Sequence, residues 1–471
     1  MSDVIWRPGD QKPRPPLLGG DVYRPDILQI IEKTIDELSP ALRELSQDIL
    51  DHPELKFEER HAHDVCTAFV EKQGFVVQRH YLLETAWVAT YSHGQGGPVL
   101  GANSEMDALP GIGHACGHNL IGIAGVAIAC AAKAAMEKLG IDRKVILLGT
   151  PGGEGGHGKV KLWEKGAYKE MDVCLMCHPA PGPPHSVSLS SCLAVVPLQV
   201  DFIGHTAHAG LSPWEGQNAL DAAVLAYTSI GLLRQQTKPT HRIHGIFQGK
   251  DWAPNIRAPR VQQAFILIYV GQKLAMYAHQ RQRKLSRLQS ESKLAFSMYK
   301  LLLANRLSSI TPSFQSRSRG YRMQSDNCQR ICWQRAGPKF GARHVALSHK
   351  LCNGLNASII LGAELTDVIC KNYGTVDYEW GISSASTDFV SDSHLCRPAL
   401  TDAMLVMPGL HPGFSIPTVP NGGNHTPAFT EAAGTIEAHE ACLDVSKALA
   451  AVGMRVLTDD TFLSNASLTC S

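Results

Sequence analysis

Residues 98–148 have the sequence PVLGANSEMDALPGIGHACGHNLIGIAGVAIACAAKAAMEKLGIDRKVILL. Pro98–Leu100 and Lys144–Leu148 are short apolar runs typical of buried strands, and Leu120–Leu139 is an alanine-rich run long enough for a helix. A helix between two strands is the repeating unit of α/β domains. We therefore predict an α/β sheet, in which ligands gather beyond the carboxyl ends of the strands.

The same alternation continues on both sides of this stretch. Asp26–Leu50 has apolar residues at helical spacing, Phe75–Val77 and Trp87–Tyr91 are expected strands, and Met171–Met176 is a further buried strand. Ala428–Met454, with alanine and leucine in an apolar stripe, is expected to form the last helix.

A second, smaller domain is expected from Ser186 onward. A strand over Leu193–Ile203, a helix over Glu215–Gln235 and a strand over Arg242–Phe247 give the β-α-β start of this domain. Its continuation is not readable, and regular structure becomes evident again only near Gly374.

Length and composition limit the class of protein. The chain has 471 residues, 44% of them apolar, which allows two or three domains and excludes a wholly disordered chain. No apolar run approaches the roughly 20 residues of a membrane span, and residues 1–20 do not resemble a signal peptide. Thirteen cysteines without paired spacing fit reduced thiols. We therefore expect a cytoplasmic protein with an unstructured segment at residues 1–24.

One stretch differs from the rest in charge. The net charge of the chain is +1, but Arg257–Lys350 holds 18 basic and two acidic residues. Such a tract could be a nucleic-acid or membrane-surface patch. Because its composition changes abruptly, we favour a poorly packed segment that arose from a faulty exon boundary, and we interpret Val390–Met407 in the same way. Binding of nucleic acid or membrane is therefore not expected.

Two motifs at the ends of the expected strands contain metal-ligand residue types. Cys116 and His118 lie in HACGH just before the long helix, where a helix N-terminus and a metal ion would keep the thiol ionised. A lone Cys-x-His is common, so this motif alone favours a structural role. Glu154 lies in the glycine-rich loop TPGGEGGHG, which lacks the ending of a phosphate-binding loop. This loop is better interpreted as presenting Glu154 to a cation than as a plain surface turn.

Two single histidines complete the set. His178 follows the strand that ends at Met176, and His425 precedes the last expected helix. Either histidine alone would more often be structural. Together with Cys116, His118 and Glu154 they supply five sulfur, nitrogen and oxygen ligands, which suit one or two zinc-like ions.

A series of motifs in this order resembles the M20 family of amidohydrolases. The motifs are DALP at Asp107, HACGH at residues 114–118, GTP followed by EGG at Glu154, AHA around His208 with PWEGQNALD at 213–221, and HTPAF at His425. The family includes hippurate hydrolases and auxin-conjugate hydrolases, and the resemblance is closer to the dipeptidase-like group of peptidase domain-containing protein two. It covers Pro25–Asn255 and Tyr373–Leu457.

The resemblance implies an α/β metallohydrolase. Its catalytic domain would comprise residues 25–185 and 351–471, with a smaller α+β lid or dimerisation domain inserted between them. Residues 186–256 would form the first half of this lid, and residues 257–350 would replace the rest, so the lid would be incomplete.

The resemblance also implies roles for individual residues. The metal ligands would be Cys116, as a bridging thiolate, with His118, Glu154, His178 and His425. Asp107 would support the metal site as a catalytic residue. His208 and Asn255 would bind the substrate, and His208 would also stabilise the oxyanion. Asp388 lies in another motif that faces the site.

The implied reaction is hydrolysis of the amide bond of a dipeptide or an N-acyl amino acid. One or two divalent ions, zinc or manganese, would be the cofactor, and the chain would form a homodimer if its lid is intact.

One position departs from the family pattern. The family has two consecutive glutamates in the loop after Gly-Thr-Pro, the first as general base and the second as metal ligand, and here Gly153 occupies the first position. We therefore expect impaired hydrolysis. The alternative is a non-catalytic relative that binds metal and ligand as a regulatory subunit.

Overall fold

A computed structural model describes residues 5–10, 15–190, 194–233, 242–248, 260–270, 359–380 and 407–468 of the chain. The chain divides into two compact units, one of residues 1–193 with 352–471 and one of residues 194–351. The predictions made for Asn255 and Asp388, and those for residues 271–350 and 390–406, lie outside the described residues.

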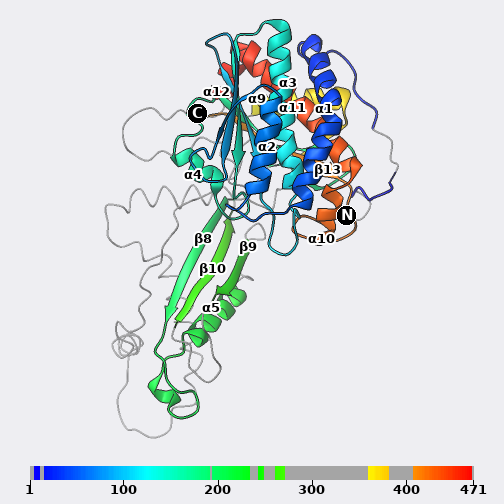
Figure 1. Ribbon diagram of the computed structural model, residues 1–471. Coiled ribbons are helices and arrows are strands. Elements are labelled where there is room, and N and C mark those ends of the chain that lie inside the picture. Colours follow the sequence, from blue (N-terminus) through cyan, green and yellow to red (C-terminus); the bar gives the residue numbers. More distant parts are fainter. Residues whose placement is uncertain are drawn as a thin grey trace. The chain divides into compact units, whose positions relative to one another are not determined.

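A six-stranded sheet is the centre of the first unit (Figure 1). Its strands, in spatial order, are β1 (Val76–Arg79), β2 (Trp87–His93), β4 (Arg143–Thr150), β3 (Val99–Glu105), β5 (Val173–Leu175) and β12 (Gly409–Leu410). The four strands from β4 to β12 are parallel, whereas β2 runs antiparallel to β4. Because Glu105 lies in register with Thr150, the carboxyl ends of β3 and β4 meet at one edge of the sheet. The predicted α/β sheet is confirmed.

Helices cover this sheet. The helices of the first unit are α1 (Pro25–Asp51), α2 (Arg60–Lys72), α3 (His118–Leu139), α4 (Gly158–Glu164), α9 (Ile359–Asn372), α10 (Pro427–Ala433), α11 (Ile436–Thr458) and α12 (Asp460–Leu468). Helix α3 packs directly on β3, and α1 and α11 pack against α3 (Figure 1).

Helix α3 corrects one expectation from the sequence. Among the described residues it is the one helix that is long and apolar enough to cross a membrane, although we expected no such run. Its most apolar window is 89% buried inside the protein, because alanine, glycine and isoleucine cover all its faces. This is the composition of a helix at the centre of a core.

Small side chains let α3 approach the sheet closely. At Gly125, an added Cβ would lie 2.4 Å from the backbone oxygen of Asn103 on β3. This distance is far inside van der Waals contact, so the helix and strand could not keep their separation with any larger residue there.

We expect Gly125→Ala to destabilise the protein by about 1–3 kcal/mol, because the added methyl group overpacks a buried contact. Gly231→Ala is the matched control: Gly231 lies near the end of a helix, and its added Cβ would meet nothing within 4 Å. The control should be neutral or stabilising by up to about 1 kcal/mol. Urea unfolding of the three proteins measures both values, and equal behaviour of the two variants would contradict the close contact.

A smaller sheet packs beside the first one in the same unit. Its strands, in spatial order, are β11 (Thr375–Asp377), β7 (Ser186–Ser188), β13 (Gly413–Ile416) and β6 (His178–Pro181). Trp6 is buried, donates its backbone N–H to Gly182 and accepts the N–H of Thr418 through its backbone oxygen. Part of the N-terminal segment thus packs on the unit, although residues 15–24 contain no helix or strand.

The single last helix expected over Ala428–Met454 is wrong. The chain forms α10, ends it before Gly434, and starts α11 at Ile436; a further helix, α12, follows α11. The break occurs because the hydroxyl of Thr435 accepts the backbone N–H of Ala438, 3.2 Å away, and caps α11. The apolar stripe continues across both helices, so the apolar pattern alone does not reveal where the first helix ends and the second begins.

The second unit contains a three-stranded antiparallel sheet in the order β8-β10-β9, with α5 (Ala219–Leu233) and a 3₁₀ turn at Pro213–Glu215. Strands β8 (Ala194–Ile203) and β9 (Arg242–Gln248) match the expected β-α-β start. The central strand β10 (Arg260–Val270) begins inside the stretch that we expected to be foreign to the fold. Its apolar residues Ala264–Val270 have the composition of a strand despite the basic residues that follow.

Candidate active site

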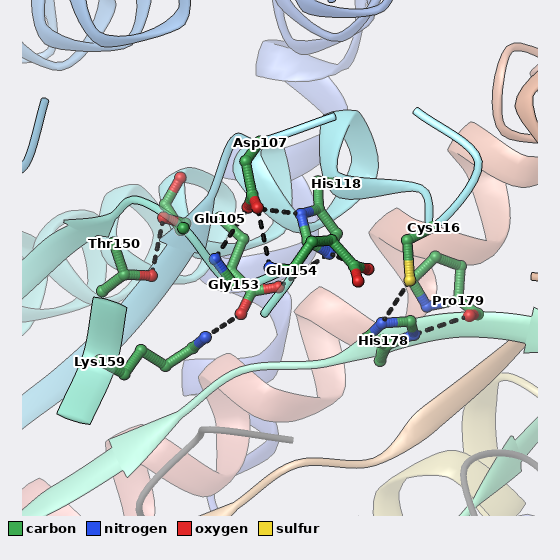
Figure 2. Close-up of polar contacts among 12 residues, drawn as sticks. Glu105, Asp107, Cys116, His118, Thr150, Gly153, Glu154, Lys159, His178 and Pro179 are labelled. Carbon is green, nitrogen blue, oxygen red and sulfur yellow. Dashed lines mark hydrogen bonds and ion pairs between the residues drawn. The ribbon is translucent and has the colours of Figure 1, made fainter. Parts of the chain in front are cut away.

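The candidate site lies at the carboxyl ends of the parallel strands (Figure 2). Glu105 ends β3 and Asp107 follows it, Glu154 follows β4, and His178 begins β6 shortly after β5. His118 is the first residue of α3. The site therefore occupies the position at which open α/β sheets bind ligands.

The five residues expected to bind metal come together in two triads that share Cys116. In one triad Cys116 meets His118 and His178, and in the other it meets Glu154 and His425, with all ligand atoms of a triad within 4.8 Å of one another. Cys116 Sγ lies 3.3 Å from His178 Nε2, and Glu154 Oε1 lies 3.3 Å from His425 Nε2. Thiolate, imidazole and carboxylate are the donors that zinc takes in proteins, so the residues present fit one or two divalent ions.

Asp107 fixes the orientation of the site. Its Oδ1 accepts the Nδ1–H of His118 at 2.9 Å, so that the ring presents Nε2 toward Glu154 Oε1, 3.6 Å away. The same carboxylate accepts the backbone N–H groups of Gly153 at 3.0 Å and Glu154 at 2.8 Å. One buried carboxylate thus holds both the α3 histidine and the glycine loop.

The tautomer of His178 is set by its neighbour. The backbone oxygen of Pro179 lies 2.8 Å from His178 Nδ1, and a carbonyl can only accept, so Nδ1 carries a proton. This leaves Nε2 to face Cys116. Asn424 donates to the same Pro179 oxygen at 3.0 Å and brings its amide within 3.9 Å of the Cys116 sulfur.

The charges of the site alternate. Burial and Glu154 oppose ionisation of Cys116, but His178 and His118 lower its pKa to about 6. Burial likewise opposes ionisation of Glu154, but His425 and His118 lower its pKa to about 2. Hydrogen bonds to Cys116 and Glu154 raise the pKa of His425 to about 10. Without an ion the protonated histidines therefore supply the positive charge of the site, and metal binding must displace their protons.

A buried ion pair that the sequence did not predict lies beside the triads. Lys159 of α4 is fully buried and pairs through Nζ with Glu105, whose other oxygen lies 3.2 Å from His118 Nε2 (Figure 2). The strand expected from the sequence covered only Pro98–Leu100, so the available signal for Glu105 was its position two residues before Asp107. Nothing in the sequence linked it to Lys159.

Gly153 faces this pair. Its backbone does not adopt a positive φ, so a side chain is conformationally allowed. An added Cβ would lie 3.0 Å from Glu105 Oε1 and 3.2 Å from His118 Cε1. A side chain at this position would therefore lie directly beside the candidate metal ligands.

One of the substrate residues expected from the resemblance, His208, belongs to the second unit. Its Nδ1 accepts the backbone N–H groups of Gly210 at 3.1 Å and Leu211 at 3.0 Å. These bonds fix the turn around His208 and leave its Nε2 for another partner.

Comparison with curated proteins identifies the family. No family model matches the chain. However, it is 34% identical to the human protein Xaa-Arg dipeptidase over 96% of this chain and 94% of the relative, and the mouse protein of the same name gives a similar match. It is also 30% identical to one of the subunits of p-aminobenzoyl-glutamate hydrolase from Escherichia coli, over 51% of this chain and 53% of that protein. The chain belongs to the M20 family of amidohydrolases.

Solved structures agree with this M20 assignment at the level of the fold. A dinuclear metal-binding M20 peptidase from Bacillus subtilis matches 90% of this chain and 99% of its own with a TM-score of 0.53 and 15% identity. An aminobenzoyl-glutamate utilization protein from Klebsiella pneumoniae matches 90% of this chain and 98% of its own with a TM-score of 0.54 and 16% identity. The fold is an α/β catalytic domain with a lid domain, and the chain is an enzyme of the hydrolase class.

We expect Glu105→Gln to destabilise the metal-free protein by about 3–5 kcal/mol, because it removes a buried counter-charge of the Lys159 ammonium. Glu170→Gln is the control: it removes the partner of Lys144 in a more exposed pair of 2.6 Å and should cost about 0–1 kcal/mol. Chemical denaturation measures both changes. An equally small loss in the two variants would show that Glu105 does not compensate the buried lysine.

Proposed function

We propose that this M20 hydrolase cleaves its amide substrate at the two triads that share Cys116, with zinc or manganese held by Cys116, His118, Glu154, His178 and His425. The observation that carries the proposal is the convergence of these side chains from four separate parts of the chain, within 4.8 Å inside each triad. A purely structural cluster does not require an ionised thiol with a pKa near 6 next to a carboxylate.

When bound, a divalent ion at this site supplies Lewis-acid activation of the amide carbonyl and of water. The chain's own residues orient that chemistry. Asp107 keeps Nε2 of His118 directed into the site, and Pro179 does the same for His178. The glycine loop stays in place because Asp107 accepts its N–H groups and because Glu59 accepts the N–H of Gly152 at 2.8 Å.

The proposed substrates are dipeptides and N-acyl amino acids. Support comes from the relatives named Xaa-Arg dipeptidase and p-aminobenzoyl-glutamate hydrolase, so dipeptides ending in arginine and p-aminobenzoyl-glutamate belong in the first panel of substrates. We assign the stabilisation of the oxyanion to His208, and contacts to the rest of the substrate to Asn255 and Asp388.

Zinc or manganese content tests the ligand assignment. After treatment with a chelator and reloading, the unaltered chain should hold one or two ions, and Cys116→Ala should hold fewer because both triads lose a ligand. Cys370→Ala, which removes a partly exposed free thiol, is the control and should match the unaltered chain. Elemental analysis measures the ratio. A chain that takes up no ion, or a Cys116→Ala variant with unchanged content, would exclude the assignment.

We also propose that Gly153 makes the enzyme slow. With no carboxylate at this position, proton removal from the attacking water lacks the general base of the family pattern. Glu105 does not replace it freely, because Lys159 and His118 already occupy its two oxygens. General-base catalysis contributes roughly 10²- to 10⁴-fold in rate, whereas the contribution of the ions remains, so the chain should be slow rather than inert.

Gly153→Glu should therefore raise turnover, by up to about 10²- to 10⁴-fold, without a change in metal content. Glu105 has to yield by a few tenths of an ångström, because the new Cβ would lie 3.0 Å from it. Gly153→Gln makes the same contacts without a base and is the matched control, for which no rise is expected. Steady-state hydrolysis of the substrate panel is the measurement.

Two outcomes of this experiment would contradict the proposal. Turnover by Gly153→Glu that is no faster than by Gly153→Gln, with both folded and metal-loaded, would show that the missing base is not at Gly153. The absence of turnover in every form, with metal bound, would favour the non-catalytic alternative.

A homodimer formed through the second unit is part of the same proposal. Among its described residues the unit exposes large apolar side chains on α5 and around it, namely Leu211, Trp214, Val224, Leu225, Tyr227, Leu232 and Ile246. Exposed apolar patches of this kind mark association surfaces. A reducing compartment such as the cytoplasm also belongs to the proposal, because all seven cysteines in the described part of the chain are free thiols.

A further inference from the structure

A second cluster of metal-ligand side chains lies where α1 ends and α2 begins. Asp48 and His52 are four residues apart in the last turn of α1 and at its end, and His61 is the second residue of α2. One ligand atom from each of the three lies within 4.8 Å of the others. We propose that this cluster, the α1–α2 triad, is a binding site for a divalent cation such as Zn²⁺, separate from the active-site triads.

The distances of the α1–α2 triad suit a tetrahedral ion. Asp48 Oδ1 lies 3.0 Å from His52 Nδ1 and 3.0 Å from His61 Nε2. Zinc bonds of about 2.0–2.1 Å place the ligand atoms of a tetrahedron roughly 3.3 Å apart. The carboxylate oxygen therefore already lies between two imidazole nitrogens at close to the separation that an ion requires.

The backbone holds these side chains in place. The spacing of Asp48 and His52 puts both on one face of α1, as in helical metal motifs that use ligands four residues apart. The carboxylate of Glu54 accepts the N–H of His61 at 2.9 Å and that of Ala62 at 3.0 Å, which fixes the first turn of α2. The rings of His52 and His61 lie 4.3 Å apart between centroids, so the site needs little rearrangement to close.

The chemistry of the site is that of two imidazoles and one carboxylate. All three side chains are partly exposed, which leaves room for water as a fourth ligand. Binding exchanges a proton for the ion at His52 Nδ1, which also lies 2.8 Å from the backbone oxygen of Asp48. Imidazole with carboxylate favours zinc over calcium or magnesium, which prefer oxygen ligands alone.

The ion would join the two ends of a loop that supports the active site. Residues 52–59 connect the two ends of the α1–α2 triad, and this loop contacts two active-site segments. The backbone oxygen of Glu54 accepts the N–H of Ala108, next to Asp107, at 2.7 Å. Glu59 accepts the N–H of Gly152, and the ring of Phe57 packs against the same glycine. We infer that the ion stabilises this loop and, through it, the segments after β3 and β4.

Zinc binding by the full chain tests the site. The unaltered chain should hold one zinc ion more than His61→Ala or His52→Ala when equilibrated at the same free Zn²⁺ concentration. His93→Ala is the matched control, because His93 pairs with Asp142 at 3.1 Å on the surface of the same unit and should leave the zinc content unchanged. Cys116→Ala lacks the ligand shared by the active-site triads, but it should keep the zinc ion of the α1–α2 triad. The experiment therefore distinguishes failure of the active-site assignment from failure of the α1–α2 triad.

Amide hydrogen exchange provides a second readout. Zinc should slow exchange in residues 52–59 of the Cys116→Ala protein, and this slowing should disappear when His61→Ala is added. Without zinc the His61→Ala variant should lose little thermal stability, because the His61–Asp48 pair is partly exposed and the backbone bond from residue 61 to Glu54 persists. Equal zinc content in all variants would overturn the proposal. So would a zinc-induced slowing of hydrogen exchange in residues 52–59 that does not depend on His61.

Discussion

The Asp107 carboxylate accepts hydrogen bonds from three groups that are remote in sequence: the imidazole of His118 and the backbone N–H groups of Gly153 and Glu154. It is buried, so each bond forms in a region of low polarity, where leaving any of these groups without a partner would be costly. The carboxylate thereby ties the end of β3 to the start of α3 and to the loop after β4. The positions of His118 and Glu154, one in each active-site triad, depend on this bond set.

A second buried carboxylate near Asp107 also requires opposite charges around it. Glu105 lies two positions before Asp107 in the chain and would place a second buried carboxylate beside it, but Lys159 neutralises it and His118 approaches its other oxygen. Burial alone would raise the pKa of both carboxyls, whereas the neighbouring cations lower them. The site thus tolerates many ionised groups in a small volume because opposite charges alternate.

Further support of the glycine loop comes from a part of the chain that carries no family motif. The loop between α1 and α2 contributes Glu59 and Phe57 to Gly152 and the Glu54 backbone to Ala108. The loop is itself held at both ends by helices packed on the core. Changes between α1 and α2 can therefore reach the active site without touching a ligand.

Local sequence determined many of the elements of this protein and the residue types of its candidate site. Apolar runs of the right length predicted β2, β4 and α3, and the residue types at strand ends, with the family motifs, predicted all five candidate ligands. Packing decided the rest. Three features depend on which elements become neighbours: the close approach of α3 at Gly125, the burial of that whole helix, and the Glu105–Lys159 pair. The α1–α2 triad likewise depends on packing, because it joins residues from two helices. A single sequence records residue types and periodicity, but distances between elements arise only when the core closes and buried charges must find partners.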